Sequence, residues 1–216
     1  MSLTLYYHPL SSYCQKVLVA LYENGAPFTP QFVDLGDPGQ RADLLKLWPV
    51  GKFPVLRDGE RIVPESSIII EHLDRYHPGK TRLIPENGDL ALQTRLRDRF
   101  FDLYVHKPMQ ALVGDRLRPL ESRDPYGVAE AKARLSASYD MIERDMAGQT
   151  WAMGEDFTLA DCAAAPSLYY ADRVLPFRDS HPGIAAYFER LLQRPSFARV
   201  VEEAGPYRHM FPAARD

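Results

Sequence analysis

Residues Gly51–Ser66 read GKFPVLRDGERIVPES, and this segment gives the clearest structural prediction in the chain. An apolar run at Phe53–Leu56 is followed by Asp58–Gly59, a strong signal for a hairpin turn, and by a second extended run at Arg61–Val63. Pro64 then ends the second strand, and apolar residues with helical spacing follow at once. The segment therefore predicts two short antiparallel strands and the start of a helix.

Two positions in this segment could bind an extended ligand. A cis peptide bond costs little only before proline, and Pro54 stands at the start of a strand, where a cis bond would turn the backbone of Phe53 toward a ligand. The Glu65 carboxylate and the Ser66 hydroxyl lie at the predicted helix N-terminus, where free N–H groups and the helix dipole favour a bound carboxylate. A surface hairpin with an ordinary N-cap would fit the same residues.

Composition and charge limit the function classes. The 216 residues carry 26 basic and 29 acidic side chains, a net charge of −3, which disfavours a nucleic-acid or anionic membrane partner. No apolar run approaches the ~20 residues of a membrane span, and the N-terminal residues do not resemble a signal peptide. The two cysteines, Cys14 and Cys162, cannot form a disulfide framework. We expect a soluble protein of a reducing compartment, the cytoplasm.

The first third of the chain predicts an α/β domain. Leu3–Tyr7 and Phe28–Val33 favour strands, and the helical pattern between them stops at Asn24–Gly25. A short helix over about 41–47 precedes the hairpin, and a helix over about 65–76 follows it. The resulting order βαβαββα is that of a thioredoxin-like domain, which we place at residues 1–77.

The remainder of the chain predicts helices only. Residues 78–88 are rich in proline, glycine and charge and form the expected linker, and residues 89–216 form the expected all-α domain. A long helix over about 89–117 should kink or break at Pro108, and another over about 159–174 should kink at Pro166. Further helices are expected over about 128–146, 184–193 and 196–204. Thr158 and Asp161 have the spacing of a capping box, to which we assign no chemistry.

The segment Val50–Leu56, followed by Glu65 and Ser66, resembles the glutathione-binding segment of the cytosolic glutathione S-transferases, with the serine-type N-terminal site of theta-like and many bacterial members. The resemblance extends from Leu3 to the final helix and includes the capping box. It implies the GST fold, a homodimer, and detoxification chemistry with glutathione as co-substrate. It assigns glutathione binding to the backbone of Phe53 beside Pro54, to Lys52 at the glycyl carboxylate, to Glu65 and Ser66 at the γ-glutamyl end, and to Asp102 (or Asp98) at its ammonium group.

Catalysis in that family requires the glutathione thiol to become a thiolate, since a free thiol has a pKa of ~8.5. One hydroxyl donor at a helix N-terminus is sufficient. The resemblance offers Ser11 at the theta-like position, Ser12 at the beta-class cysteine position, and Tyr7 at the tyrosine of the alpha, mu and pi classes. We favour Ser11, because Tyr7 ends a strand while both serines start a helix. Both serines could instead be simple helix caps.

Cys14 tests a rival class, the disulfide oxidoreductases. Ser11 occupies the position of the exposed first cysteine that dithiol chemistry requires, so its identity argues against this class. Cys14 and Cys162 are expected in the core. His72 and His77 are five residues apart, which would place them on different faces of a helix, so no metal site is expected. No nucleotide-binding glycine motif is present in the sequence.

The second substrate, a hydrophobic electrophile, is expected against the helical domain. An isomerase or dehalogenase on the same fold, or a non-catalytic glutathione or ligand carrier, are the alternatives to a transferase that conjugates electrophiles or reduces peroxides. Aromatic residues at helical spacing are often core residues instead. The candidate pocket residues are Leu10, Tyr104, His106, Met109, Val113, Tyr169 and Tyr170.

Overall fold

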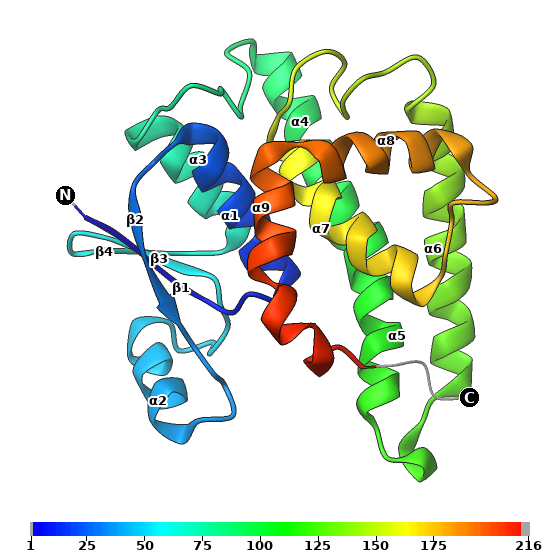
Figure 1. Cartoon of the computed structure of the whole chain (residues 1–216), viewed down its shortest axis with the longest axis horizontal. Helices are drawn as coiled ribbons and strands as arrows, with labels where there is room; N and C mark the ends of the chain where they lie inside the picture. The colour runs from blue at the N-terminus through cyan, green and yellow to red at the C-terminus, as the bar shows by residue number, and fades with distance from the viewer. Residues whose placement is uncertain (1, 213–216) are drawn as a thin grey trace.

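The computed structural model describes residues 2–212 (Figure 1). A small α/β domain is followed by a helical domain, as predicted. Four strands form one mixed sheet in the order β2-β1-β3-β4. Strands β1 and β2 are parallel, and β3 pairs antiparallel with β1 and with β4. The strands are β1 (Leu3–Tyr7), β2 (Phe28–Phe32), β3 (Val55–Asp58) and β4 (Arg61–Pro64).

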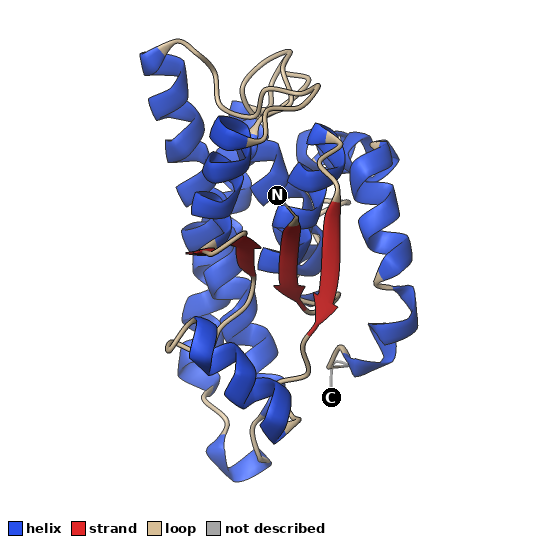
Figure 2. Ribbon diagram, turned by 90° about the vertical axis from the view of Figure 1, so that its left-hand side faces the viewer, coloured by secondary structure: helices blue, strands red, loops and turns tan. Residues whose placement is uncertain are grey.

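Three helices cover the two faces of this sheet. Leu5 and Leu56 belong to the main core with α1 (Ser12–Asn24) and α3 (Ser66–Tyr76), whereas Val55 packs in a smaller cluster with Leu44 of α2 (Pro38–Leu47). This division follows from the alternation of side chains along each strand. Figure 1 shows α2 separated from the other two helices, and Figure 2 shows helices on both sides of the strands. Helix α1 ends as predicted at Gly25, whose φ of 66° suits a glycine.

The second domain is an array of helices around α7, which is buried along most of its length. Helix α1 of the first domain packs against both α7 and α9, so the two domains share one core. No helix within residues 2–212 is long and apolar enough to cross a membrane. The helical elements are α4 (Gly88–Phe100), η1 (Phe101–His106), α5 (Lys107–Leu117), η2 (Leu120–Ser122), α6 (Pro125–Asp145), α7 (Leu159–Val174), α8 (Pro182–Gln193), α9 (Pro195–Glu203) and η3 (Gly205–Met210).

The helix predicted over 89–117 is interrupted, as expected, but the interruption begins before Pro108. Residues Phe101–His106 form a π-helix, whose wider turn is seen in the bond from the Lys107 N–H to the Asp102 carbonyl. Pro108 lies in the first turn of α5, where its missing N–H costs least. The sequence therefore marks the break, while the π-helical form requires a rearranged hydrogen-bond ladder that local propensity does not reveal.

The capping box at the start of α7 is confirmed. The Thr158 hydroxyl accepts from the Ala160 N–H, and the Asp161 carboxylate accepts from the Thr158 N–H at 2.9 Å. Asp161 also accepts from Tyr187 Oη at 2.7 Å. Burial raises the pKa of Asp161 despite these bonds. Helix α7 continues through Pro166 to Val174, and the kink at Pro166 stays a prediction.

A second buried contact joins the two domains at Glu23 on α1. Its carboxylate accepts two bonds of 2.7 Å from Arg194, which precedes α9, and further bonds from Ser196 and from Thr81 of the linker. The Glu23 side chain is 8% exposed. Three segments distant in sequence are therefore held by one carboxylate.

Candidate functional site

The hairpin segment has the geometry that the sequence predicts. The Phe53–Pro54 peptide bond is cis, Pro54 is buried, and Phe53 packs partly buried beside the α2 cluster. Lys52 is exposed, and its ammonium group makes no ion pair or hydrogen bond within residues 2–212. Lys52 is therefore available to an anionic ligand beside Phe53.

Glu65 has a backbone conformation unusual for its residue type. Its φ is +69°, the only positive φ of a non-glycine residue in the described chain, and such a conformation costs of order 1–3 kcal/mol. The side chain is exposed and makes no capping bond, while Ser66 is buried. The first N–H groups of α3 and the Glu65 carboxylate are thus left for a ligand.

Ser11 is the N-cap of α1. Its Oγ accepts a long bond of 3.3 Å from the Cys14 N–H, and the side chain is only partly buried. Its hydroxyl proton has no acceptor among residues 2–212, so it is free for a ligand. Cys14 is fully buried, and burial raises the pKa of its thiol to about 12. The expectation that Cys14 is a core residue is confirmed, as it is for Cys162.

Ser12 makes a different contact. Its side chain is buried, and its Oγ is hydrogen-bonded to Nε2 of His106 in the π-helical segment of the other domain. Burial, together with the charge of Lys16, lowers the pKa of His106 to about 3, so the ring is neutral. Tyr13 covers this ring at 4.2 Å between centroids. His106 therefore packs against the first two residues of α1, Ser12 and Tyr13.

The hydrogen-bond pattern of His106 bears on which atom donates to Ser12. Nδ1 of His106 is buried without a partner in the described chain, and a neutral imidazole carries one N–H. A proton on Nδ1 would be a buried donor without an acceptor, which is rarer in proteins than an unpaired acceptor. A proton on Nε2 would instead leave the buried Ser12 hydroxyl proton without an acceptor, so either tautomer leaves one buried donor unpaired within residues 2–212.

Tyr7 lies apart from the two serines in its contacts. It is partly buried at the end of β1 and packs against the main core. Burial, followed by the nearby Glu203 and Tyr207, raises the pKa of its phenol. Tyr7 therefore remains protonated near neutral pH.

Asp102 belongs to a buried charge network between the domains. Its Oδ2 lies 2.9 Å from Nζ of Lys16, which is 1% exposed and also lies 2.5 Å from Asp98 Oδ1. Ser67 donates to Asp98 at 2.8 Å, and Arg99 contacts Ser67 and both carboxylates. Burial raises the pKa of Asp102, an effect that Lys16 opposes. Asp102 thus belongs to the network that contains Ser67, and its charge is already paired with Lys16.

A pocket of about 100 Å³ opens beside Leu10, the residue before Ser11. Tyr170 of α7 fixes this loop, since its hydroxyl donates to the Leu10 carbonyl at 2.9 Å and receives a bond from Gln15 at 3.0 Å. The Arg173 guanidinium lies 3.6 Å from the centre of the Tyr169 ring. The lining residues are Leu10, Tyr169, Tyr170, Arg173, Ala204, Arg208 and Phe211.

The structure brings three of the seven predicted pocket residues together, namely Leu10, Tyr169 and Tyr170. Tyr104 is 58% exposed on the π-helical segment, and Met109 is buried in the core. Val113 packs partly buried against that core. These residues and His106 do not line this pocket.

His8 lies between two of the predicted ligand-binding loops and was not among the residues predicted from the sequence. Its Nδ1 accepts from the Leu10 N–H at 3.2 Å, and its ring lies 6.1 Å from that of Phe53 and 5.6 Å from that of Tyr207. It therefore connects the loop before α1 with the cis-proline loop. The His8-Pro9 pair at a strand end was the available signal.

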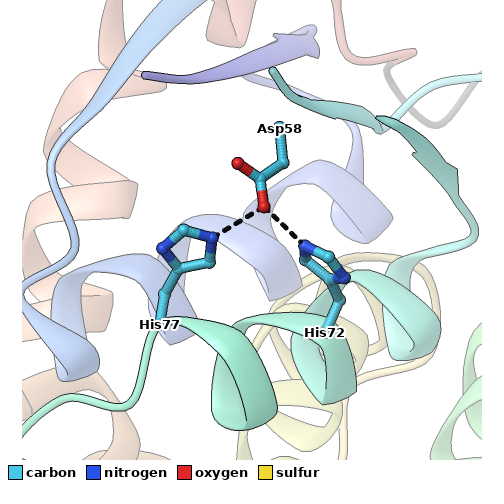
Figure 3. A group of neighbouring side chains, drawn as sticks. All are labelled: Asp58, His72 and His77. Atoms are coloured by element: carbon cyan, nitrogen blue, oxygen red, sulfur yellow. Dashed lines mark hydrogen bonds and ion pairs between the residues drawn. The ribbon is translucent and has the colours of Figure 1, made fainter. Parts of the chain in front are cut away.

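Three further side chains meet at the far end of β3. Nε2 of His72 and Nε2 of His77 lie 3.0 and 2.8 Å from the same Oδ2 of Asp58 (Figure 3). The expected separation of the two histidines is wrong, because α3 ends at Tyr76 and His77 has non-helical dihedral angles (φ −134°, ψ 52°). The backbone leaves the helix after Tyr76, and this change of direction brings His77 to Asp58.

Comparisons with known proteins agree with this architecture. Residues 5–81 match the glutathione S-transferase N-terminal domain, and residues 125–190 match the C-terminal domain. Glutathione S-transferase 3 of Zea mays is 32% identical over 208 residues, which cover 92% of this chain and 93% of the relative. A stringent starvation protein A homolog of Histophilus somni is 26% identical over 206 residues, 94% of this chain and 92% of the relative. A glutathione S-transferase structure from Methylobacillus flagellatus with GSH bound has a TM-score of 0.85 and 26% identity, covering 92% of this chain and 98% of that one.

Proposed function

Since the chain belongs to the glutathione S-transferase family, we propose that it binds glutathione, holds the thiol as a thiolate and directs it onto a hydrophobic electrophile or a peroxide. The observation that carries this proposal is the state of Ser11. Its partly exposed hydroxyl stands at the N-terminus of a 13-residue helix, and its proton has no acceptor within residues 2–212. The hydroxyl and the helix dipole both favour an anion there.

The remaining parts of glutathione have matching groups. The backbone of Phe53 beside the cis bond would pair with the cysteinyl residue, and the unpaired Lys52 would bind the glycyl carboxylate. Glu65, Ser66 and the free N–H groups of α3 would hold the γ-glutamyl end. Asp102 would act there together with Arg99, as part of the network that includes Ser67.

The pocket beside Leu10 supports a specific class of electrophile. Three of its seven lining residues are aromatic, and two others, Arg173 and Arg208, are exposed cations. An apolar, ring-containing electrophile that also carries an anionic group would therefore be preferred over a neutral one. In the reaction, the thiolate sulfur forms a bond to the electrophilic carbon while the leaving group departs with its electron pair.

A homodimer is the expected assembly. An ion pair between Glu71 and Arg95 links α3 to α4. Large apolar side chains one turn away on the two helices, Ile68 and Leu92, are 54% and 62% exposed. These two exposed side chains are available to a second copy, and a measurement of molecular mass in solution would detect the resulting dimer.

Titration of the bound glutathione thiol tests the catalytic proposal. We expect thiolate absorbance to report a thiol pKa lowered by at least about one unit, corresponding to about 1.4 kcal/mol. Ser11→Ala should abolish this shift, whereas Ser12→Ala and Tyr7→Phe should retain most of it. Binding without a shift in the wild type would contradict a transferase and indicate a glutathione carrier. Absence of binding would contradict both.

A further inference from the structure

The Asp58–His72–His77 cluster has the donor atoms of a metal site. Two imidazole nitrogens and a carboxylate oxygen lie within 4.8 Å of one another, and both nitrogens already point at one oxygen (Figure 3). Imidazole and carboxylate together suit Zn²⁺ and related divalent transition metals. Their bonds to Zn²⁺ measure ~2.0–2.2 Å, so the donors need to separate only slightly from their present hydrogen-bond distances.

The cluster is largely buried and contains a carboxylate oxygen that an ion could pair with. The side chains of His72, Asp58 and His77 are 6%, 11% and 25% exposed, so the cluster is enclosed but open at His77. The second carboxylate oxygen, Asp58 Oδ1, is buried with no hydrogen-bond partner among residues 2–212. A buried carboxylate oxygen without a partner is costly, and a cation beside it would supply one.

The surrounding charges do not occupy the site. Arg61 is the strand partner of Asp58 in the β3–β4 ladder, but its guanidinium lies over the Tyr76 ring at 5.1 Å. Arg75 lies over the same ring at 5.4 Å. Within the described residues, the contacts of the Asp58 carboxylate are with the two histidines.

We propose that Asp58, His72 and His77 bind one divalent transition-metal ion, with Zn²⁺ the best match, and that water completes its coordination. Each imidazole then binds through an unprotonated Nε2, and the ion replaces the two hydrogen bonds to Oδ2. The ion would join the turn of the β3–β4 hairpin to the end of α3.

The site is separate from the proposed glutathione site. Strand β3 begins next to Pro54 and ends at Asp58, and α3 begins next to Glu65 and ends next to His77. An 11-residue helix spans about 16 Å, so the cluster lies at the opposite end of the elements that present Phe53 and Ser66. Loss of the metal site and loss of glutathione binding can therefore be distinguished.

The experiment uses the untagged full-length chain, stripped with a chelator and kept free of glutathione, which itself binds metals. Isothermal titration should show one Zn²⁺ per chain, and Co²⁺ should produce visible absorption bands of a low-symmetry site. His77→Gln keeps a side-chain amide donor for Asp58 but is a poor ligand, so it should lower affinity at least tenfold while remaining folded. His181→Ala is the matched control, because His181 pairs with a single carboxylate, Asp140, at 3.2 Å.

The results divide clearly. Stoichiometric binding that is weakened by His77→Gln and His72→Ala, but not by His181→Ala, supports the site. A rise in melting temperature with Zn²⁺ that disappears in His77→Gln supports it as well. Absence of saturable binding, or equal affinity in the wild type and His77→Gln, would overturn the proposal and leave the cluster as a hydrogen-bonded clamp.

Discussion

The hydroxyl of Ser12 is hydrogen-bonded to Nε2 of His106, across the boundary between the two domains. This contact fixes the first turn of α1, which also contains the proposed thiolate donor, against the π-helical segment of the helical domain. Ser11 and Ser12 are adjacent in sequence, yet Ser11 is partly exposed and caps the helix, whereas Ser12 is buried against an imidazole. Their substitutions should therefore have different effects.

We expect Ser12→Ala to reduce stability rather than thiolate formation. The change leaves the buried His106 Nε2 without its partner, at a cost of about 1–3 kcal/mol in the free energy of unfolding. The double variant Ser12→Ala/His106→Phe removes both polar groups and should lose less than the sum of the single changes. Urea denaturation measures this coupling, and strictly additive losses would show that the contact contributes no stability.

Lys52→Ala should weaken glutathione binding without affecting chemistry. If Lys52 binds the glycyl carboxylate equally in ground and transition states, its loss raises KM for glutathione about tenfold and leaves kcat unchanged. Lys46→Ala is a suitable control, because Lys46 is 75% exposed and already paired with Asp43. A matching rise in KM for Lys46→Ala would indicate a general charge effect instead.

Arg173→Ala and Arg208→Ala should change electrophile preference. Each removes a cation from the pocket wall, so KM for an electrophile bearing a carboxylate should rise several-fold. A neutral ester of the same electrophile should react with nearly unchanged kcat/KM, since its apolar contacts with Tyr170 and Phe211 persist. Equal losses for both compounds would argue against charge recognition in this pocket.

Glu23→Gln should destabilise the protein in a pH-dependent manner. Burial alone would raise the pKa of Glu23, but hydrogen bonds from Arg194 and Ser196 outweigh it, and the pKa is lowered. A carboxyl group with a lowered folded-state pKa stabilises the fold above its unfolded pKa of ~4.3, and this contribution is lost as the pH falls through the folded value. The variant should therefore be less stable than the wild type near neutral pH.

Denaturation curves between about pH 3 and pH 7 measure this difference. The gap in the free energy of unfolding between wild type and Glu23→Gln should narrow as the pH falls from the unfolded pKa toward the lower folded pKa, below which Glu23 is protonated in the folded protein as well. A gap that stays constant across the range would mean that the charge of Glu23 contributes nothing. Glu86→Gln provides a control, because Glu86 is 78% exposed in its pair with Arg82.

Local signals in the sequence were sufficient for much of the fold. The Asp58–Gly59 turn, the Gly25 helix end and the Thr158–Asp161 box each act through neighbouring residues, so their structures follow from short segments. The cis bond before Pro54 and the N-cap at Ser11 likewise follow from short segments. The roles of these residues toward glutathione remain predictions.

The parts that the sequence did not reveal depend on distant segments. The pocket includes Arg208 and Phe211 near the C-terminus together with Leu10 near the N-terminus, and no periodicity links them. Likewise, His77 reaches Asp58 because the helix ends one residue earlier than a helical spacing argument assumes. Such features require knowledge of where each element ends and what it faces.

The buried network around Lys16 limits how the two halves of this chain could be recombined with others. Lys16 belongs to the α/β half, but its carboxylate partners, Asp98 and Asp102, come from the helical half. A chimera that joined residues 1–77 to a helical half with apolar side chains at those positions would leave an ammonium group without a counter-ion, which typically costs several kcal/mol. A stable chimera would therefore need carboxylates at both positions of the helical half to pair with Lys16.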